Sequence, residues 1–568
     1  MTTDYRLMTL ERKTSLEEVV TSEQTVYLHI DPFSDCIPIG TAKFSGLVAV
    51  MGYDWHQQTK AIMQSLPFSD LILADEFGAG LLKANGFERT AITQWQGVNP
   101  GPQRPDSRVE RDIDLLFVGD LDYNIAYERN RWLDRLAILS DGFNIVFLPP
   151  QPEDKLVELC QRTKIVFDST LSGGISHLAL VGASCGALVM LHSENTVGLS
   201  CLKPDVHCVT YSRDTLEDKF LQMLRDQKRR ENIANSASKY VRREFSERKL
   251  FSSLCTLLRS NLEMAGKREA AAFSAEQEAE ALVNQWTNCA SYPEREILHR
   301  QIELTGSLWS ELKKNAAKAY FIAKASIKLD IEARITELSH AINLLRDTCS
   351  NDEECICAPF SLATMLLERY LLSKSVQTDN ISDLSEAAEH FNKAVERCET
   401  GWKYNDESMT GFVYTASDAL MNLRLQKAWR TRDMTEGEWL NEMRTVITSS
   451  AYARLSDIAL MQNNVDEALK YAYRSALITP EEADFLIRLA ATEALTGRYE
   501  EAITHYREGL YLSPLRTTAW PELLKLLYLA NKVDEAENYL EERQRVIRAI
   551  PSFEHMNKIL ESVRQELH

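Results

Sequence analysis

A change of pattern near residue 260 constrains the fold of this chain more than any other feature of its sequence. Before it, short β-branched or apolar runs alternate with amphipathic segments, and after it the strand-like runs stop. Such alternation is typical of parallel strands joined by crossover helices, whereas Ala, Leu, Glu, Lys and Arg at helical spacing predict helices alone. The sequence therefore predicts an α/β part followed by an all-α part. The expected strands are TVYLHID, GLVAVMGYD, DLILAD, TAITQW, DIDLLFVGD, FNIVFLPP, KIVFDST, ALVML and HCVTYS.

The α/β part divides at VNPGPQRPDSRVERD (98–112), a segment rich in Pro, Gly and charge. Such a composition is typical of a linker, so we expect two Rossmann-like units. A chain of 568 residues is long enough for several domains. The expected domains are a short first unit (1–105), a second unit (106–260), a helical region with possible degenerate repeats (261–445), three repeats (446–550) and a C-terminal capping helix (551–568).

The C-terminal helices carry an internal period of 34 residues. Each period has a large residue that opens a first helix, a small residue where two helices cross and, in two cases, a closing proline. The pattern resembles tetratricopeptide repeats, in which helix pairs stack because none can bury its apolar face alone. The resemblance implies a surface that binds a protein partner. The residues in register are Tyr452, Leu486 and Trp520, then Ala468, Ala502 and Ala536, and finally Pro480 and Pro514.

Composition excludes several other classes of protein. A formal charge of −19 argues against a nucleic-acid partner, because such binding depends on Lys and Arg that neutralise phosphates. No apolar run approaches the roughly 20 residues of a membrane span, and no signal core follows the N-terminus, so we expect a cytoplasmic protein. The 11 cysteines lack paired zinc spacing and indicate reduced thiols, with no metal site.

The stretch SGGISHLALVGASCGALVM (172–190) follows a predicted strand and opens a predicted helix. Ser176 can cap that helix, whose free N–H groups and dipole would then face whatever lies above Gly173 and Gly174. A diphosphate fits such a turn. A tight strand-to-helix turn without any ligand fits it as well, and the local sequence leaves both readings open.

The serial order of these segments resembles the GT-B glycosyltransferases over roughly residues 25 to 255. LILADEFGAGLLKANGFERTAITQWQGVNP (71–100) looks like the end of that superfamily's first unit, and IDLLFVGDLDYNIAYERNRWLDRL (113–136) like the start of its second. SGGISHLALVGASCGALVM then resembles the donor-binding core. The resemblance implies an enzyme that transfers a sugar from a nucleotide-sugar, bound mainly by the second unit, without a metal or another cofactor.

The same resemblance implies a set of donor contacts. Basic side chains and a helix N-terminus would neutralise the diphosphate, and a loop after the ALVML strand would contact the sugar or phosphate. The expected donor-binding residues are Gly119, Arg129, Arg131, Ser172, Gly173, Gly174, Ile175, His177, Asn195 and Thr196.

Four residues of the first unit are candidate catalytic bases. His29 and Asp31 lie in YLHIDP, and Asp54 and His56 lie in GYDWHQ, at the ends of two predicted strands. Ligands of open α/β sheets bind at the carboxyl ends of strands, and the ordinary pKa of His suits proton transfer near neutral pH. A structural role at a strand end is the alternative for each.

Three departures from the family pattern bear on activity. Val181 stands where the family has an acidic residue that holds the donor ribose, and Leu178 stands near a family Arg, with His177 the nearest polar substitute. The first unit is also short. Two hypotheses follow: a glycosyltransferase whose expected acceptor is a protein held by the repeats, or an inactive glycosyltransferase-like domain on an interaction scaffold. A third, another nucleotide-binding fold, lacks a Gly-x-Gly-x-x-Gly motif or a Walker Lys.

Overall fold

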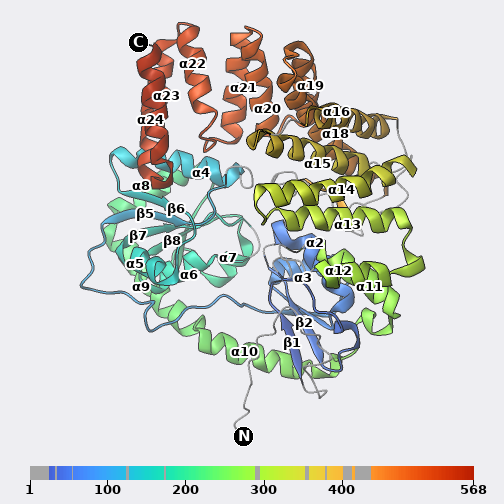
Figure 1. The fold of residues 1–568 in the computed structure, drawn as a ribbon. Coiled ribbons are helices and arrows are strands. Elements are labelled where there is room, and N and C mark those ends of the chain that lie inside the picture. The colour runs from blue at the N-terminus through green and yellow to red at the C-terminus, as the bar shows by residue number, and fades with distance from the viewer. Residues whose placement is uncertain are drawn as a thin grey trace. The chain divides into compact units, whose positions relative to one another are not determined.

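The computed structural model describes residues 25–31, 35–53, 55–122, 127–171, 174–287, 289, 295–351, 357–377, 380–400, 412–415 and 436–567, and its elements are labelled in Figure 1. The chain forms two compact units, and each unit joins segments that are far apart in sequence. The first comprises Met1–Ala74, Gly78–Ile92 and Thr256–Leu455, and the second comprises Asp75–Phe77, Thr93–Cys255 and Ser456–His568. Each unit thus combines a parallel sheet with helices from the C-terminal half.

The sheet of the first unit has four parallel strands that follow one another in chain order, β1-β2-β3-β4. Trp55 is only 2% exposed and packs among Val50, Ile72 and Leu82 beneath this sheet. A Cβ at Gly78 would lie 1.9 Å from the Trp55 ring, so the packing requires glycine there. The elements are β1 (Val26–His29), η1 (Thr41–Lys43), β2 (Leu47–Met51), α2 (Trp55–Ser65), η2 (Leu66–Phe68), β3 (Leu71–Ala74), α3 (Glu76–Ala84) and β4 (Thr90–Ile92).

A buried ion pair attaches the later helical segment to this first sheet. The Arg268 guanidinium donates to both the Asp70 carboxylate (2.6 Å) and the carbonyl oxygens of Phe44 (2.7 Å) and Gly46 (2.6 Å). Both charged side chains are 0% exposed. Trp286 adds a second attachment, because its indole N–H donates to the Ile37 carbonyl at 3.1 Å.

Helices make up the rest of the first unit among the described residues, as the sequence predicts. Two short 3-10 helices, η4 (Leu262–Met264) and η5 (Glu269–Ala272), lie between α10 and α11 in the chain. The elements are α10 (Glu247–Ser260, which continues from the second unit), η4 (Leu262–Met264), η5 (Glu269–Ala272), α11 (Ala275–Trp286), α12 (Arg295–Leu304), η6 (Gly306–Leu308), α13 (Glu311–Ser326), α14 (Ile331–Asn351), α15 (Cys357–Ser375), α16 (Ile381–Glu399) and α18 (Glu436–Met461, which continues into the second unit).

The sheet of the second unit has five parallel strands in the order β6-β5-β7-β8-β9. Leu115 of β5 pairs with Ile145 on one side and with Ile165 on the other. The chain therefore leaves β5 in one direction to form β6 and returns across it to form β7. The elements are β5 (Ile113–Val118), α4 (Tyr127–Ala137), η3 (Ile138–Asp141), β6 (Ile145–Leu148), α5 (Glu153–Arg162), β7 (Thr163–Phe167), α6 (His177–Ser184), β8 (Leu188–His192), α7 (Thr196–Cys201), β9 (Cys208–Tyr211), α8 (Leu216–Arg225) and α9 (Gln227–Glu244).

Each of the nine expected strands coincides with a strand of these two sheets. The Pro-rich segment between the sheets is fixed to the second unit. Val98 is fully buried and forms a parallel bridge with Ser246, and Arg111 donates to the carbonyl oxygens of Cys185 (2.6 Å) and Thr163.

The last helices of the chain belong to the second unit and share its hydrophobic core. Leu515, Val546 and Ile550 are at most 3% exposed and lie in the same cluster as the side chains of β5, β7 and α4. Figure 1 shows α23 beside α4, with the strands of the second sheet below them. The elements are α19 (Val465–Ile478), α20 (Ala483–Leu495), α21 (Tyr499–Leu512), α22 (Trp520–Leu529), α23 (Val533–Ala549), η8 (Pro551–Phe553) and α24 (Glu554–Leu567).

The period found in the sequence coincides with these helices. The helices α19 and α21 begin 34 residues apart and also end 34 residues apart. The alanines in register, Ala468, Ala502 and Ala536, are all 0% exposed. Small residues at these positions let paired helices approach closely. The assignment of the helices to the tetratricopeptide family stays a prediction. Among the described residues, no helix is long and apolar enough to cross a membrane.

Candidate functional site

The strand order of the second sheet reverses at β5. The strands next to β5 are β6 and β7, whose connections leave the sheet in opposite directions. In open α/β sheets a ligand binds at such a switch point, outside the carboxyl ends of the strands. Gly119 follows β5 at this edge, and Asp168 follows β7. These two strand ends define the candidate site.

Asp168 organises the turn that leads from β7 into α6. Its carboxylate accepts hydrogen bonds from the Thr170 N–H (2.8 Å), the Ser176 N–H (3.2 Å) and the Ser176 hydroxyl (2.8 Å). Asp168 is 2% exposed, and the buried Tyr211 hydroxyl donates to its carbonyl oxygen at 2.9 Å. The sequence analysis missed both residues, although an Asp directly before the glycine turn, in KIVFDST, is a signal for such a role.

The start of α6 has the geometry of an anion site. The Ser176 hydroxyl accepts from the Ala179 N–H at 3.1 Å and so caps the helix, as predicted. Gly174 has a φ of 107°, in the region that favours glycine. The first turn of α6 contains no acidic residue, but the Asp168 carboxylate accepts from the Ser176 N–H at this end of the helix and balances part of the positive end of its dipole. Ser172 and Gly173, the other predicted members of this turn, lie outside the described residues.

Asn195 fixes the Gly174 turn from the next loop. Its amide N–H donates to the Gly174 carbonyl (3.0 Å), and its amide oxygen accepts from the Gly198 N–H (2.8 Å), which caps α7. Asn195 is fully buried and positions the turn with both ends of its amide. Contact of Asn195 or Thr196 with a donor stays a prediction.

The two predicted arginines of α4 do not lie together. The Arg129 guanidinium lies 5.9 Å from the Phe117 ring centroid, near the end of β5, whereas the Arg131 guanidinium lies 5.5 Å from the Tyr511 ring centroid on α21. Residues two apart point to different sides of a helix, which explains the separation. Of the pair, Arg129 is therefore the better placed for a ligand at the strand ends. The Gly119 N–H is used within the sheet, where it donates to the Leu148 carbonyl at 3.0 Å.

The remaining donor candidates lie at the start of α6. Ile175 is 3% exposed and packs in the core between α6, β8 and α9. His177 is exposed, and its Nε2 lies 2.9 Å from a carboxylate oxygen of Glu153. Val181, at the position where the GT-B pattern has an acidic residue, is fully buried in the core of the second unit.

Aromatic rings line the adjacent strand ends. His192 ends β8 and stacks on Trp132 with ring centroids 5.0 Å apart, while Tyr211 meets His192 edge-on at 5.2 Å. Burial lowers the pKa of His192, which keeps its imidazole neutral near pH 7. The rings connect α4 with the Asp168 turn through packed side chains.

The candidate bases of the first unit lie on or beside its strands. His29 ends β1, is 3% exposed, and has its Nδ1 2.9 Å from the Tyr27 hydroxyl. Burial lowers the pKa of His29 to about 4, with nearby Asp35 and Asp31 acting in the opposite direction. Asp31 is half-buried. His56 lies in the first turn of α2, and Asp54 lies outside the described residues, so the catalytic roles stay predictions.

No group of three His, Cys, Asp or Glu side chains that could hold a metal ion occurs in the described part of the chain. The predicted donor site is therefore built from a helix N-terminus, a glycine turn and arginine. Such groups can bind a phosphate or diphosphate through N–H donors and fixed positive charge.

Comparison with known families gives one match. Residues 107–255, which include all of the second sheet, match a family described as "Glycosyl transferase-like". That domain is thus glycosyl transferase-like in sequence. No curated protein matches the chain.

Solved structures resemble parts of the chain. TarM is 10% identical over 43% of this chain and 56% of its own, with a TM-score of 0.33. Anabaena Alr3699/HepE, in complex with UDP and glucose, is 11% identical over 39% of this chain and 74% of its own, with a TM-score of 0.33. The C-terminal domain of a Francisella tularensis glycosyl transferase group 1 family protein, LpcC, is 11% identical over 26% and 99%, with a TM-score of 0.23. This chain therefore covers just over half of TarM, and none of these likenesses assigns an activity to it.

Proposed function

We propose that the second unit binds a nucleotide-sugar at the carboxyl ends of β5 and β7 and transfers the sugar to an acceptor. The observation that carries the proposal is the turn at Gly174, where a left-handed glycine and a capped helix N-terminus lie at the switch point of the sheet. The glycosyl transferase-like sequence of residues 107–255 supports the reaction class.

The proposed chemistry requires that negative charge on the leaving diphosphate be stabilised as the sugar departs. The first turn of α6 offers N–H donors and the positive end of a helix dipole, and Arg129 offers a fixed charge near the end of β5. Asp168 keeps the turn in place through its three accepted hydrogen bonds.

A base that activates the acceptor hydroxyl belongs to the same proposal, if the reaction inverts the configuration of the sugar. The candidates are His29, Asp31, Asp54 and His56. A pKa of about 4 makes His29 a weak proton acceptor, and its burial restricts access. Asp31, which follows the same strand and is less buried, is the stronger candidate of that pair.

We infer a protein acceptor from the helices of the second unit. Stacked helix pairs offer long surfaces that suit polypeptide ligands better than small sugars. The helices α19 to α23 repeat with a regular period and share a core with the glycosyl transferase-like domain. A bound protein would thus be held by the same compact unit that binds the donor.

The direct test is calorimetric titration of the full-length protein with nucleoside diphosphates and their sugars, UDP and UDP-glucose included. We expect micromolar binding of one nucleotide and its loss in Gly174→Asp, which strains the turn and adds negative charge. Gly266→Asp is the matched control, because Gly266 also has a positive φ (73°) but lies in an open turn of the first unit. The absence of any binding at millimolar concentration would overturn the proposal.

A second candidate function is supported by Val181. Its side chain is buried in the core of the domain, so this position supplies no carboxylate for a donor ribose. A domain that binds a nucleotide without turnover, or binds none, would then act as a scaffold. Release of nucleoside diphosphate from a bound nucleotide-sugar, measured with a coupled assay, separates the two candidates: sustained release identifies an enzyme.

A further inference from the structure

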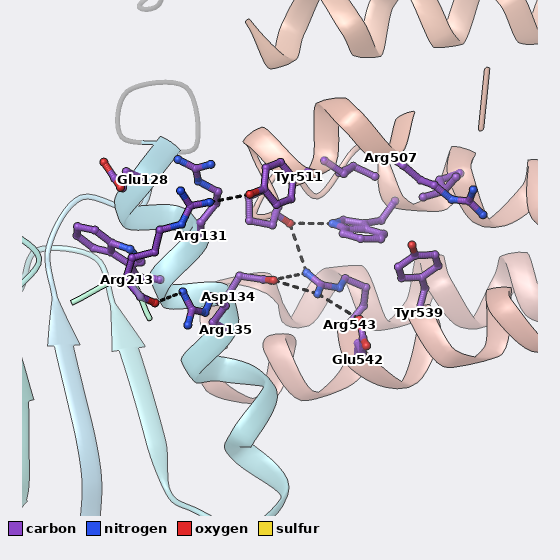
Figure 2. Close-up of a pocket in the computed structure, with 15 residues that line it drawn as sticks. Glu128, Arg131, Asp134, Arg135, Arg213, Arg507, Tyr511, Tyr539, Glu542 and Arg543 are labelled. Carbon is purple, nitrogen blue, oxygen red and sulfur yellow. Dashed lines mark hydrogen bonds and ion pairs between the residues drawn. The ribbon is translucent and has the colours of Figure 1, made fainter. Parts of the chain in front are cut away.

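A cavity of about 420 Å³ lies inside the second unit, between α4 and the helices α21, α22 and α23 (Figure 2). This volume is within the range of about 300–1,000 Å³ that is typical of ligand pockets. One wall comes from the glycosyl transferase-like domain and the other from the repeat helices. A ligand in this cavity would contact both parts at once.

The floor of the cavity is rigid and already formed. The Arg543 guanidinium, 5% exposed as a residue, donates to both carboxylate oxygens of Asp134 (2.5 and 3.3 Å) and lies 4.2 Å from the Trp520 ring centroid. The Trp520 indole N–H donates to the Pro514 carbonyl at 2.8 Å. These contacts hold the apolar ring of Trp520 in place, so little ordering is needed when a ligand binds.

Two arginine side chains contact the exposed Tyr511 at the mouth of the cavity. Tyr511 is 60% exposed; the Arg213 guanidinium donates to its hydroxyl at 2.7 Å, and the Arg131 guanidinium lies over its ring (Figure 2). Arg135, by contrast, is neutralised by two bonds of 2.6 Å to Glu217. Within the described residues, neither Arg131 nor Arg213 forms an ion pair with a carboxylate. Each guanidinium can therefore form an ion pair with a carboxylate of a ligand.

Most of the arginines that line the cavity are already neutralised. Among the described lining residues five are arginines and three are acidic. Three of these arginines form ion pairs: Arg135 with Glu217, Arg507 with Glu535 and Arg543 with Asp134. The two arginines at the mouth, Arg131 and Arg213, therefore favour an anionic ligand.

The surface continues beyond the cavity along the repeat. Leu477 of α19 occupies the same position in its helix as Tyr511 in α21, and it is 66% exposed. Tyr473 likewise corresponds to Arg507 of the cavity and is 55% exposed. A strip of apolar and aromatic side chains therefore extends from the mouth of the cavity to the preceding repeat. Exposed side chains that recur along stacked helices suit an extended chain better than a small molecule.

We propose that this cavity and strip form a docking site for an extended, acidic peptide segment of a protein partner. Carboxylates of the segment bind Arg131 and Arg213, an apolar side chain enters the cavity above Trp520, and further apolar side chains lie on Tyr511 and Leu477. That this partner is the sugar acceptor rests on the proposed function; the docking site itself does not.

The experiment measures fluorescence anisotropy of labelled peptides with the full-length protein. The probes are extended peptides of equal length in which Leu and Tyr alternate with Glu, with Lys or with Gln. We expect binding of the Glu series alone, weakened by added salt. Arg131→Glu and Arg213→Glu should each lower the affinity about tenfold. Lys228→Glu, the same charge change at an exposed position of α9, should leave it unchanged.

Tyr511→Ala and Tyr511→Phe test the geometry of the mouth. The alanine variant loses the ring between the two arginines and should weaken binding as strongly as a charge reversal. The phenylalanine variant keeps the ring and loses only the hydroxyl that Arg213 contacts, so a smaller loss is expected. Thermal unfolding of every variant checks that the second unit is intact, and a variant with a lowered melting temperature is replaced by Arg213→Ala, whose site is exposed.

Three results would overturn the docking site. These are equal binding of the Glu and Lys series, no binding of any series, or equal losses in Lys228→Glu and Arg213→Glu. Calorimetric binding of pyrophosphate without binding of any peptide would instead identify a small-anion pocket. Nucleotide binding by the wild-type protein is measured separately. Failure there with successful peptide binding removes the proposed donor and leaves the docking site standing.

Discussion

The two sheets of this protein differ in strand order, and the difference makes the second sheet the better candidate for a ligand site. The described strands of the first sheet follow chain order from β1 to β4, so every connection runs in one direction and no switch point arises. The strand order of the second sheet reverses at β5, and open α/β sheets bind ligands at such a position. The ends of the strands support the same comparison. In the first sheet β1 ends in a buried His29, whereas in the second sheet β7 leads into a glycine turn and a helix N-terminus.

The ion pairs that attach helices to the two sheets differ in how completely they are enclosed. Arg268 and Asp70 in the first unit are 0% exposed, and carbonyl oxygens satisfy the guanidinium further. Arg543 and Asp134 in the second unit border a cavity, and the Arg543 Nε has no acceptor among the described residues. We interpret the first pair as purely structural and the second as part of a surface that meets a ligand.

Removal of the fully buried Arg268–Asp70 pair should have the largest effect on stability. Arg268→Ala leaves the Asp70 carboxylate buried without its partner, and breaking a buried pair costs about 3–5 kcal/mol. Denaturant unfolding followed by circular dichroism measures the loss of free energy. Arg229→Ala breaks the exposed pair with Asp205 and serves as the control, with an expected loss of about 0–1 kcal/mol. Equal losses would refute the interpretation of the Arg268 pair.

Acid should weaken the first unit through His29. Its pKa is about 4 in the folded protein and 6.5 as an ordinary value, so the unfolded chain binds the proton more readily. The stabilising contribution is complete above pH 6.5 and is lost as the pH falls toward 4, by on the order of 3 kcal/mol. Unfolding free energies across this range should fall less steeply in His29→Asn. His340→Asn, at an exposed position of α14, should retain the wild-type profile.

Removal of the Arg543–Asp134 pair should destabilise the protein less than removal of the buried Arg268–Asp70 pair. Arg543→Ala leaves Asp134 beside a cavity that water can enter, and we expect a loss of about 1–3 kcal/mol. The loss should be local, since α23 is attached to α4 through this pair. Hydrogen exchange is therefore expected to quicken in α23 and α4 and to stay unchanged in the first sheet. Uniform exchange across both units would contradict this assignment.

The smallest change in stability is expected at the donor turn. Ser176→Ala removes the cap of α6 and one of the hydrogen bonds to Asp168, at a cost of about 1 kcal/mol. Nucleotide affinity should fall more than stability does, because the turn is then less well ordered for a diphosphate. Calorimetric titration and thermal unfolding of the same variant compare the two. Ser200→Ala, whose hydroxyl donates to the Val197 carbonyl within α7, is the matched control.

Much of the fold was predictable because its signals are local. The nine strands follow from short β-branched or apolar runs, and continuous runs such as LVAVM and LLFV are typical of buried parallel strands. The helix cap by Ser176 was predictable for the same reason, since the cap and the N–H that it accepts lie three residues apart.

The rest depends on contacts between distant segments, which a single sequence does not reveal. Nothing near Arg131 indicates that its neighbour is Tyr511 rather than a diphosphate, because the two residues are brought together only by the packing of α4 on α21. Asp134 and Arg543 are likewise 409 residues apart. Of the predicted donor residues that the structure describes, Gly174 lies in the turn that follows β7, and the two arginines lie apart.

The shared core of the second unit has a consequence for how the protein is made. Leu515, Val546 and Ile550 complete the packing of a sheet whose last strand ends at Tyr211. Chains grow at about 5–20 residues per second, so the nascent sheet emerges from the ribosome tens of seconds before these side chains exist. During that interval part of its apolar surface has no permanent cover. We expect the newly made sheet to engage chaperones and to reach its final packing only after residue 550 has been made.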